Sequence, residues 1–410
     1  MLIHSHPTGN TFSRAAAHAF CTQGWLKEFH TCISWNGDNT IFNKFFPTLN
    51  HQFSRRSFSE IPEHLIYPYP WRESLRLFGL GQRFPWLGRH EHGPLSIDGI
   101  YRSLDRRVAK RLLHQADLQA VYAYEDGALH TFKAARAQGL VCFYDLPIGY
   151  WRAAHEIYLE ESDLQPSWAC TLTGLEDSPD KLLIKDEELS LSSAVIVPSE
   201  YVRSTLIQHD ACSSPIHVVP FGSPPPLNNL HQAPNSSSPL RVLFVGSLGQ
   251  RKGLSYALDA VELLGDSVKL TLIGRPTTAN CSPLNAALVR HNWIETLSHQ
   301  QILEQMRQHD VLLFPTLFDG FGLVITEALS QGLPVITTVN SGGPECIRHG
   351  LEGFIVPIRS SEAVAEHLLQ LANNRDQLES MRLACLRRAA ELSWSCYERE
   401  LIASISQSFS

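Results

Sequence analysis

Residues 310–348 read DVLLFPTLFDGFGLVITEALSQGLPVITTVNSGGPECIR. Within this stretch, the apolar run at 311–314 ends at Pro315, which is typical of a strand buried on both faces of a parallel sheet. A glycine-containing turn then leads into 323–330, which has the length and the closing residues of a helix. A second apolar run at 335–338 is followed by glycines and another helix start. The stretch therefore predicts two strand–turn–helix units in tandem, as in α/β proteins.

Both turns carry glycine where the helix begins, with Gly320 and Gly322 in the first turn and Gly343 in the second. Glycine lets a ligand approach the backbone closely, and the exposed N–H groups at a helix start favour phosphate. Tandem units of this kind bring both turns to the carboxyl edge of one sheet. We therefore predict a ligand that contains phosphates.

Two acidic residues, Asp319 and Glu327, stand eight residues apart across the first turn. With about five of those residues helical at roughly 1.5 Å of rise each, the carboxylates are expected on the order of 8–12 Å apart. The carboxylate pairs of glycosidases flank a single bond at roughly 5–9.5 Å. The spacing therefore favours groups that hold hydroxyls at the two ends of a long ligand, such as the ribose and the sugar of a nucleotide-sugar.

The order of motifs in this stretch is specific. Asp-Gly-Phe-Gly at 319–322 is followed by Glu-Ala-Leu at 327–329, Gly-Leu-Pro-Val-Ile at 332–336 and Gly-Gly at 342–343. This order resembles the donor-site signature of the family 4 retaining glycosyltransferases, which have the GT-B fold. That family carries glutamate at both acidic positions, whereas this chain has the shorter Asp319 at the first.

The resemblance implies two Rossmann-like domains whose parallel sheets face a central cleft. It also implies a hexosyltransferase-like enzyme that moves a sugar from a nucleotide-sugar donor to a glycan or lipid-linked acceptor, with retention of anomeric configuration, in polysaccharide or glycoconjugate biosynthesis. No cofactor is expected beyond the donor substrate. No metal is expected in the chemistry, because the sequence has no pattern of metal-ligating residues.

Two adjacent cations, Arg251 and Lys252, stand beside glycines at a predicted helix entrance after the strand at 240–246. Such a pair is a reasonable clamp for phosphate, although a loop without a ligand could also carry it. Lys252 matches the lysine that family 4 enzymes place on the donor diphosphate. Ser247 stands where the family has arginine, so Arg251 is expected to supply the missing charge.

The resemblance implies roles for further residues. Lys252, Arg251 and Asp319 are expected to be catalytic, with Asp319 on the sugar, and Glu327 is expected on the ribose. The other expected donor-binding residues are Gly320, Phe321, Gly322, Leu323, Gly343, Gly246, Gly274 and Gly9.

The end of the strand at 140–144 also resembles a family segment, one that often reads His-Asp-Leu, with Tyr144 here in the histidine place. Tyrosine can donate a hydrogen bond but does not change charge near neutral pH. Tyr144 and Asp145 are therefore interpreted either as sugar-proximal or as structural residues. Asp319, Ser247 and Tyr144 all depart from the family pattern. A non-catalytic nucleotide-sugar-binding protein on the same fold is therefore the alternative function.

The chain has 410 residues, which is too long for one core and suits two domains. Strands alternate with helices throughout, and 223–239 is rich in proline and serine. We therefore expect an N-terminal acceptor-side domain at 1–222, a linker at 223–239 and a nucleotide-sugar-binding domain at 240–385. The resemblance adds a C-terminal helix at 386–410 that crosses back to the first domain.

The composition narrows the class of protein and its partners. A net charge of −7 argues against a general nucleic-acid binder. The nine cysteines include no C-x-x-C pair, which indicates reduced thiols. The N-terminus lacks the pattern of a secretory signal, and no run of 18 apolar residues occurs. We expect a cytoplasmic protein, with peripheral attachment at the inner face of the membrane left open.

Two segments have a biased charge. Residues 51–111 contain eleven Lys or Arg against six Asp or Glu, interleaved with aromatic residues and prolines. This segment is interpreted either as an acceptor-side surface for an anionic partner, such as a lipid-linked phosphate or a membrane, or as ordinary solvated arginines. Residues 160–188 are acidic and predicted to be helical, with 185–188 on a solvated face.

Overall fold

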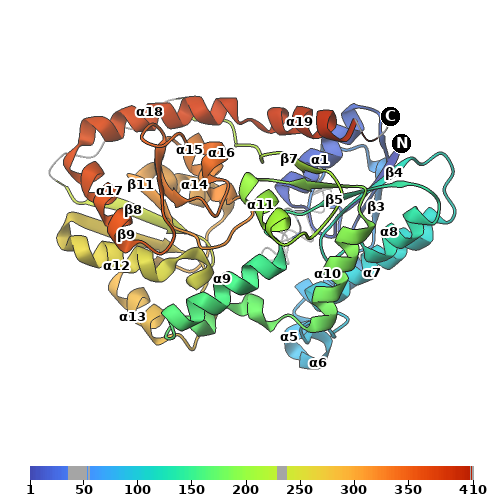
Figure 1. The fold of residues 1–410 in the computed structure, drawn as a ribbon, viewed down its shortest axis with the longest axis horizontal. Coiled ribbons are helices and arrows are strands. Elements are labelled where there is room, and N and C mark those ends of the chain that lie inside the picture. The colour runs from blue at the N-terminus through green and yellow to red at the C-terminus, as the bar shows by residue number, and fades with distance from the viewer. Residues whose placement is uncertain (36–52, 54–55, 229–237, 407, 409–410) are drawn as a thin grey trace, which may run out of the picture.

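The computed structural model describes residues 1–35, 53, 56–228, 238–406 and 408, and it has two halves, each built on a parallel sheet (Figure 1). The first half runs from blue to green in the figure, and the second runs from yellow to red. Many strands are buried along their whole length, as expected when helices cover both faces of a parallel sheet. The arrangement confirms the predicted α/β class with two Rossmann-like sheets.

Within the described residues, the first sheet has seven strands in the order β3-β2-β1-β4-β5-β6-β7, and all neighbours are parallel. The strands are β1 (Leu2–Ser5), β2 (Leu26–Thr31), β3 (Ile66–Pro68), β4 (Ala120–Tyr124), β5 (Val141–Asp145), β6 (Ala194–Val197) and β7 (Ile216–Val218). In the same part of the chain, the second sheet has six strands in the order β10-β9-β8-β11-β12-β13. These are β8 (Leu240–Val245), β9 (Val268–Ile273), β10 (Asn292–Ile294), β11 (Val311–Phe314), β12 (Val335–Thr338) and β13 (Gly353–Val356).

The helices connect these strands and cover the sheets. In the first half they are α1 (Thr11–Thr22), α4 (Trp71–Leu77), α5 (Leu80–Arg83), α6 (Pro85–Gly88), α7 (Ile97–Leu112), α8 (Leu129–Arg136), α9 (Trp151–Leu164), α10 (Pro179–Leu191) and α11 (Glu200–Gln208). In the second half they are α12 (Leu254–Leu264), α13 (Ser282–Arg290), α14 (His299–Gln308), α15 (Leu323–Ser330), α16 (Gly343–Cys346), α17 (Ser361–Asn373), α18 (Arg375–Glu391) and α19 (Trp394–Ser406). None of the helices in the described part of the chain is long and apolar enough to cross a membrane.

The stretch 310–348 forms β11, α15 and β12 at the residues that the sequence predicts. The helix predicted after β12 is α16, and it has only four residues. The helix of the second strand–turn–helix unit is therefore shorter than that of the first.

The chain passes between the halves at two places that lie side by side. After β7, the Ser223 N–H donates to the Leu392 carbonyl at 2.6 Å, at the junction of α18 and α19. Helix α18 packs on α15 of the second half, and α19 packs on α1 of the first (Figure 1). The predicted linker at 223–239 includes residues 229–237, which lie outside the described residues.

Aromatic rings join the two halves beside this crossing. The Phe221 ring stacks on Phe12 of α1 with centroids 4.9 Å apart, and its centroid lies 5.3 Å from that of Phe321 in the second half. All three side chains are buried in one hydrophobic cluster. The carboxyl edges of the two sheets are thereby held facing each other.

Replacing Gly222 by alanine tests this packing. A Cβ at Gly222 would lie 2.5 Å from the Trp394 Cα atom, so the crossing would have to shift. We expect Gly222→Ala to lower the free energy of unfolding by about 1–3 kcal/mol, as overpacking usually does. The control is Gly127→Ala, whose Cβ would make only ordinary contacts, the nearest at 3.5 Å. Equal midpoints of urea unfolding for the two variants would contradict the expectation.

Candidate functional site

A cavity of about 290 Å³ lies between the two halves, at the carboxyl edges of both sheets. The first half contributes Phe12, Pro147 and Phe221 to its lining. The second half contributes Val245, Gly246, Lys252, Phe314, Asp319, Phe321, Gly322, Leu323 and Val324. Six residues that the sequence predicts for a donor site therefore meet here: Gly246, Lys252, Asp319, Phe321, Gly322 and Leu323.

Lys252 and Asp319 form the charged centre of this cavity. Lys252 ends the 3-10 turn Gln250–Lys252, and its ammonium contacts the Asp319 carboxylate directly. The Arg251 guanidinium lies 3.6 Å from the same carboxylate and donates to the Phe318 carbonyl at 2.9 Å. Two cations therefore face one carboxylate, which leaves an excess of positive charge.

The protonation of this group follows from burial and charge. Burial lowers the pKa of Lys252 below its ordinary value, and the attraction of Asp319 opposes that shift. For Asp319, burial acts to raise the pKa, but Lys252 and Arg251 outweigh it and hold the pKa below its ordinary value. The carboxylate is therefore ionised at neutral pH and paired with a lysine that is readily disturbed by a competing anion.

The backbone around Asp319 is shaped by two glycines. Gly322 has a φ of +81° and begins α15 without a side-chain cap, and Leu323 and Val324 of the first turn line the cavity with it. A Cβ at Gly320 would overlap the Pro147 carbonyl oxygen of the other half. The Gly320 carbonyl also accepts a hydrogen bond from the Ser199 hydroxyl at 2.6 Å. The predicted donor turn is therefore pressed against the first half.

Glu327 lies on α15, and its carboxylate is 3.0 Å from Nε2 of His299 at the start of α14. The side chain of Glu327 is partly accessible, whereas that of His299 is well exposed. Sequence reasoning gave His299 no role because nothing in its local pattern links it to a residue 28 positions away. The contact orients the Glu327 carboxylate, which lies outside the lining of the cavity.

Three predicted glycines lie outside the cavity lining. Gly274 ends β9 against Gly246, where a Cβ would overlap the Gly246 carbonyl. The Gly343 N–H donates to the Ser341 hydroxyl at 3.0 Å, so this amide already has a partner within the loop. Gly9 lies in the turn between β1 and α1, beside the cavity residue Phe12 but not in the lining itself.

Tyr144 and Asp145 do not reach the cavity. The Tyr144 hydroxyl donates to Glu188 at 3.0 Å, and Asp145 accepts from the Tyr122 hydroxyl at 2.6 Å. All these groups are buried within the first half, and burial raises the pKa of Asp145 to about 7. These buried contacts favour the structural interpretation of both residues, and the sugar-proximal interpretation stays a prediction. Pro147, just beyond the strand, lines the cavity instead.

The prediction of a solvated face at 185–188 is wrong. Glu188 is buried and accepts hydrogen bonds from the N–H groups of Asp126, Ala128 and Leu129 at the start of α8. Lys185 is buried with Glu125 and Asp126, to which its ammonium is bonded at 2.9 and 3.2 Å. An acidic residue is expected to be exposed unless the fold brings buried hydrogen-bond donors or cations to its carboxylate.

Glu161 on α9 is a further residue that sequence reasoning missed. Its carboxylate is fully buried, and its donors come from the second half. Oε1 accepts from Gln250 at 2.7 Å and from Tyr256 at 2.9 Å, while Oε2 accepts from Arg359 at 2.7 Å. The Gln250 N–H also donates to the Thr171 hydroxyl at 2.9 Å. The turn that carries Arg251 and Lys252 is therefore fixed by the first half.

A second cavity of about 180 Å³ adjoins the first, because Phe12 and Pro147 line both. Its other lining residues are His6, Asn10, Ile97, Asp98, Tyr101, Tyr124, Glu125 and Asp126. Burial lowers the pKa of His6 to about 4 against the opposing contact with the Thr8 carbonyl, so the imidazole is neutral near pH 7. This second cavity offers carboxylates and a neutral ring.

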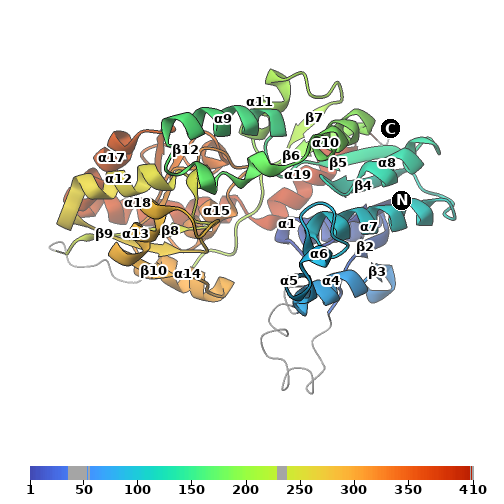
Figure 2. The ribbon, with the colours of Figure 1, turned by 90° about the horizontal axis from the view of Figure 1, so that it is seen from below.

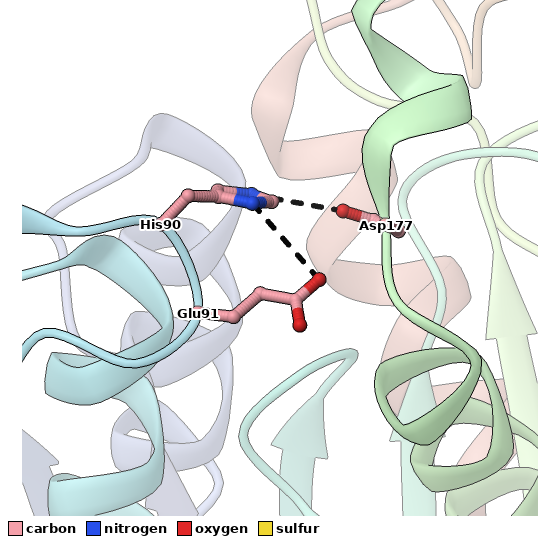
Figure 3. A group of neighbouring side chains, drawn as sticks. All are labelled: His90, Glu91 and Asp177. Atoms are coloured by element: carbon pink, nitrogen blue, oxygen red, sulfur yellow. Dashed lines mark ion pairs between the residues drawn. The ribbon is translucent and has the colours of Figure 1, made fainter.

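Within the described residues, the metal-ligating side chains close enough to share an ion are His90, Glu91 and Asp177 (Figure 3). His90 is 3.7 Å from Asp177 and 4.0 Å from Glu91. The Lys181 ammonium lies 2.9 Å from Asp177, and such a cation competes with a metal ion. None of these residues lines the interlobe cavity.

Comparisons with known proteins agree with this architecture. Residues 228–385 match the family model described as glycosyl transferases group 1. The amylovoran biosynthesis glycosyltransferase AmsK of Erwinia amylovora is 28% identical over 184 residues, which are 41% of this chain and 45% of that protein. The phosphatidyl-myo-inositol mannosyltransferase of Mycobacterium leprae is 29% identical over 167 residues, 39% of this chain and 45% of that protein. The chain thus spans less than half the length of these relatives.

Solved structures match over the whole chain. Sucrose-phosphate synthase from Thermosynechococcus elongatus has a TM-score of 0.65 at 14% identity and covers 100% of this chain and 98% of its own. Anabaena HepE in complex with UDP-glucose has a TM-score of 0.63 at 16% identity and covers 99% of each chain. The fold of this protein is therefore GT-B.

Replacing Glu161 by glutamine tests the contact between the halves. The change removes the charge from a fully buried group and leaves Arg359 paired only with Glu160, whose side chain is mostly exposed. We expect Glu161→Gln to lower the free energy of unfolding by on the order of 3 kcal/mol. Glu156→Gln on the same helix is the control, because its side chain is 71% exposed and should change stability little. A midpoint of urea unfolding that moves equally in both variants would rule out this role.

Proposed function

We propose that this protein is a retaining glycosyltransferase of the family 4 type, which moves a hexose from a nucleotide-sugar to a glycan or lipid-linked acceptor. The observation that carries the proposal is the contact of Lys252 with Asp319 in a cavity between the halves, beside the start of α15, with Arg251 3.6 Å from the same carboxylate. The match of residues 228–385 to group 1 glycosyl transferases supports it. The names of AmsK and of the mannosyltransferase support a place in polysaccharide or glycolipid synthesis.

The leaving group of such a transfer is a nucleoside diphosphate, whose negative charge grows in the transition state. Lys252 would exchange its contact with Asp319 for the diphosphate, and Arg251 would add a second cation. The uncapped N–H groups at the start of α15 would stabilise the same oxygens. This scheme uses only groups of the chain and requires neither a cofactor nor a metal.

The two acidic side chains would hold the rest of the donor. Asp319, once released from Lys252, would accept hydrogen bonds from the sugar hydroxyls. Glu327, oriented by His299, would accept them from the ribose. The backbone of Gly320, and of Gly322 beyond it, would let the sugar approach closely. Retention would follow from attack on the face that the diphosphate leaves, as the resemblance to family 4 implies.

The acceptor would enter through the adjoining cavity of the first half, the acceptor-side cavity. Asp98 and Asp126 there can accept hydrogen bonds from a glycan, and Pro147 lines both cavities. His6 would be neutral and would not repel a cationic or anionic acceptor. Closure of the halves around both substrates would exclude water, which otherwise competes with the acceptor. We place this reaction in the cytoplasm.

Alanine replacement of Lys252 and Glu327 tests the donor site. We expect each variant to lower transfer by on the order of 10²-fold or more, the scale of a lost transition-state contact, with Lys252→Ala acting more on turnover than on donor binding. Lys269→Ala and Glu304→Ala, at exposed positions of the same half, are the matched controls. Unfolding midpoints measured in parallel separate lost chemistry from lost structure. Near-normal rates in both site variants would remove the mechanism.

A panel of UDP-, GDP- and ADP-sugars identifies the donor and separates an enzyme from a binding protein. We expect one sugar nucleotide to bind by calorimetry and to release free nucleoside diphosphate in the presence of acceptor. NMR of the product is expected to give the anomeric configuration of the donor. Binding without any release would leave a non-catalytic binder, and an inverted product would exclude the retaining mechanism.

A further inference from the structure

Helices α4, α5 and α6 expose an unusual set of side chains. Trp71 is 78% exposed and Trp86 is 69% exposed, and Leu75, Phe78 and Phe84 are exposed as well. We call these five residues the α4–α6 face. The three short helices lie together on the outside of the first half (Figure 2), and α5 and α6 lie at the lower edge of the molecule in Figure 1. Single exposed apolar residues are ordinary on a protein surface, but a group that includes two tryptophans marks an interaction site.

Helix α4 exposes apolar side chains and buries an acidic one, whereas an ordinary surface helix does the opposite. Trp71, Leu75 and Phe78 follow a spacing of i, i+4 and i+7, so they form one stripe, and that stripe faces solvent. The acidic residue of the helix, Glu73, is only 1% exposed and is bonded to Arg56 at 2.6 Å and to Arg76 at 2.7 Å. The fold therefore buries the charged side of α4 and leaves its apolar side available for a partner.

The charge around this face has one sign. All residues from 71 to 91 are described, and the carboxylates among them, Glu73 and Glu91, are both buried. Arg72, Arg83 and Arg89 are exposed in the same stretch. The face is therefore apolar and cationic on a chain whose net charge is −7. Tryptophan and phenylalanine beside arginine suit the interface of an anionic lipid bilayer, where the rings enter the headgroup region and the cations meet phosphates.

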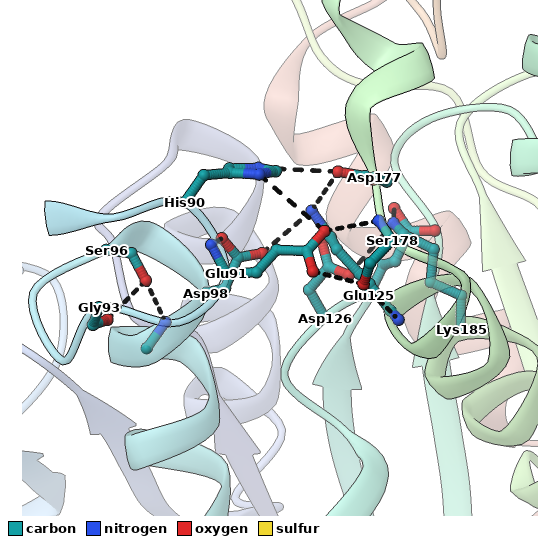
Figure 4. A network of polar contacts seen from close by, with 12 residues as sticks. His90, Glu91, Gly93, Ser96, Asp98, Glu125, Asp126, Asp177, Ser178 and Lys185 are labelled. Atoms are coloured by element: carbon teal, nitrogen blue, oxygen red, sulfur yellow. Dashed lines mark hydrogen bonds and ion pairs between the residues drawn. The ribbon is translucent and has the colours of Figure 1, made fainter. Parts of the chain in front are cut away.

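A polar network holds this face rigidly to the body of the first half (Figure 4). Glu91, which follows α6 by three residues, accepts from the Ser178 N–H at 2.8 Å and from the Ser178 hydroxyl. Lys181 of α10 is bonded to Asp177 at 2.9 Å and to Asp98 at 3.0 Å. Asp98 also lines the acceptor-side cavity. The loop after α6 is therefore tied to α10 and to a residue that lines that cavity. These contacts oppose a rearrangement that would bury the aromatic rings of the α4–α6 face.

We propose that the α4–α6 face docks on the surface of an anionic lipid bilayer, with Trp71 and Trp86 in the interfacial region and the neighbouring arginines at the headgroups. Docking would bring to the bilayer the half of the protein that contains the acceptor-side cavity, which Ile97 and Asp98 of α7 help to line. This goes beyond the proposed glycosyl transfer. Vesicle binding is measured without turnover, so failure of one proposal leaves the other standing.

The test is cosedimentation of the full chain with vesicles of phosphatidylcholine alone or with about one third phosphatidylglycerol. We expect binding to the anionic vesicles, weakened by 0.5 M salt because screening shortens the reach of the arginines. Trp71→Ala combined with Trp86→Ala, and Arg83→Glu combined with Arg89→Glu, are each expected to lower the partition coefficient by on the order of tenfold or more. Calorimetric binding of the donor identified above should stay unchanged in both variants.

The matched controls change the same kind of surface elsewhere. Leu263→Ala with Leu383→Ala removes exposed apolar side chains, and Arg136→Glu with Arg387→Glu makes the same change of charge. Both controls should bind vesicles as the unchanged protein does. The proposal fails if the unchanged protein ignores anionic vesicles, or if the controls lose binding as strongly as the face variants. It also fails if sedimentation velocity detects a dimer that only the face variants abolish, since the occupant would then be a second copy of the chain.

Discussion

The carboxylate of Glu161 is the contact on which the relation between the two halves depends. Moving an ion out of water costs several kcal/mol, so this group stays buried only because Gln250, Tyr256 and Arg359 satisfy both of its oxygens. Arg359 reaches it from a left-handed backbone, with φ of +62°, a conformation that costs about 1–2 kcal/mol. The second half is therefore held in a defined position against α9 of the first by the contacts of Glu161.

The contacts of Glu161 explain how the charged centre of Lys252 and Asp319 is positioned. Gln250, held by Glu161 and by Thr171, directly precedes Arg251 and Lys252 in the same turn. Across the cavity, the turn at Gly320 is pressed against the first half, which leaves the carboxylate before it within reach of the lysine. An aspartate that is shorter than the glutamate of the family pattern still contacts the lysine. The two halves thus act together to set the electrostatics of one site.

The predicted residues that the fold brings to the cavity follow local patterns in the sequence. Gly322 precedes α15 with a backbone in the left-handed region, which favours glycine. Lys252 follows glycines after the end of a strand. The predicted residues that lie outside the cavity have other partners. Tyr144 turns to Glu188, 44 positions away, and the Gly343 amide is already bonded within its own loop. The aromatic residues of the α4–α6 face are visible in the sequence, but the outward direction of Trp71 is seen only with the opposite side of α4, where Glu73 is buried and paired.

The sequence by itself determined the α/β class, the two parallel sheets and the glycine-containing turn at 319–322, because apolar runs and glycine positions are short-range signals that act within each strand–turn–helix unit. Only the tertiary structure decided which carboxylates are buried and which face a ligand. Glu161 and Gln250 are 89 positions apart, and nothing in the residues around either one indicates the other. Burial of an ion depends on donors that the fold brings together. The contacts of Glu161 between the halves, and the solvent-facing apolar stripe of α4, are therefore seen only in the tertiary structure.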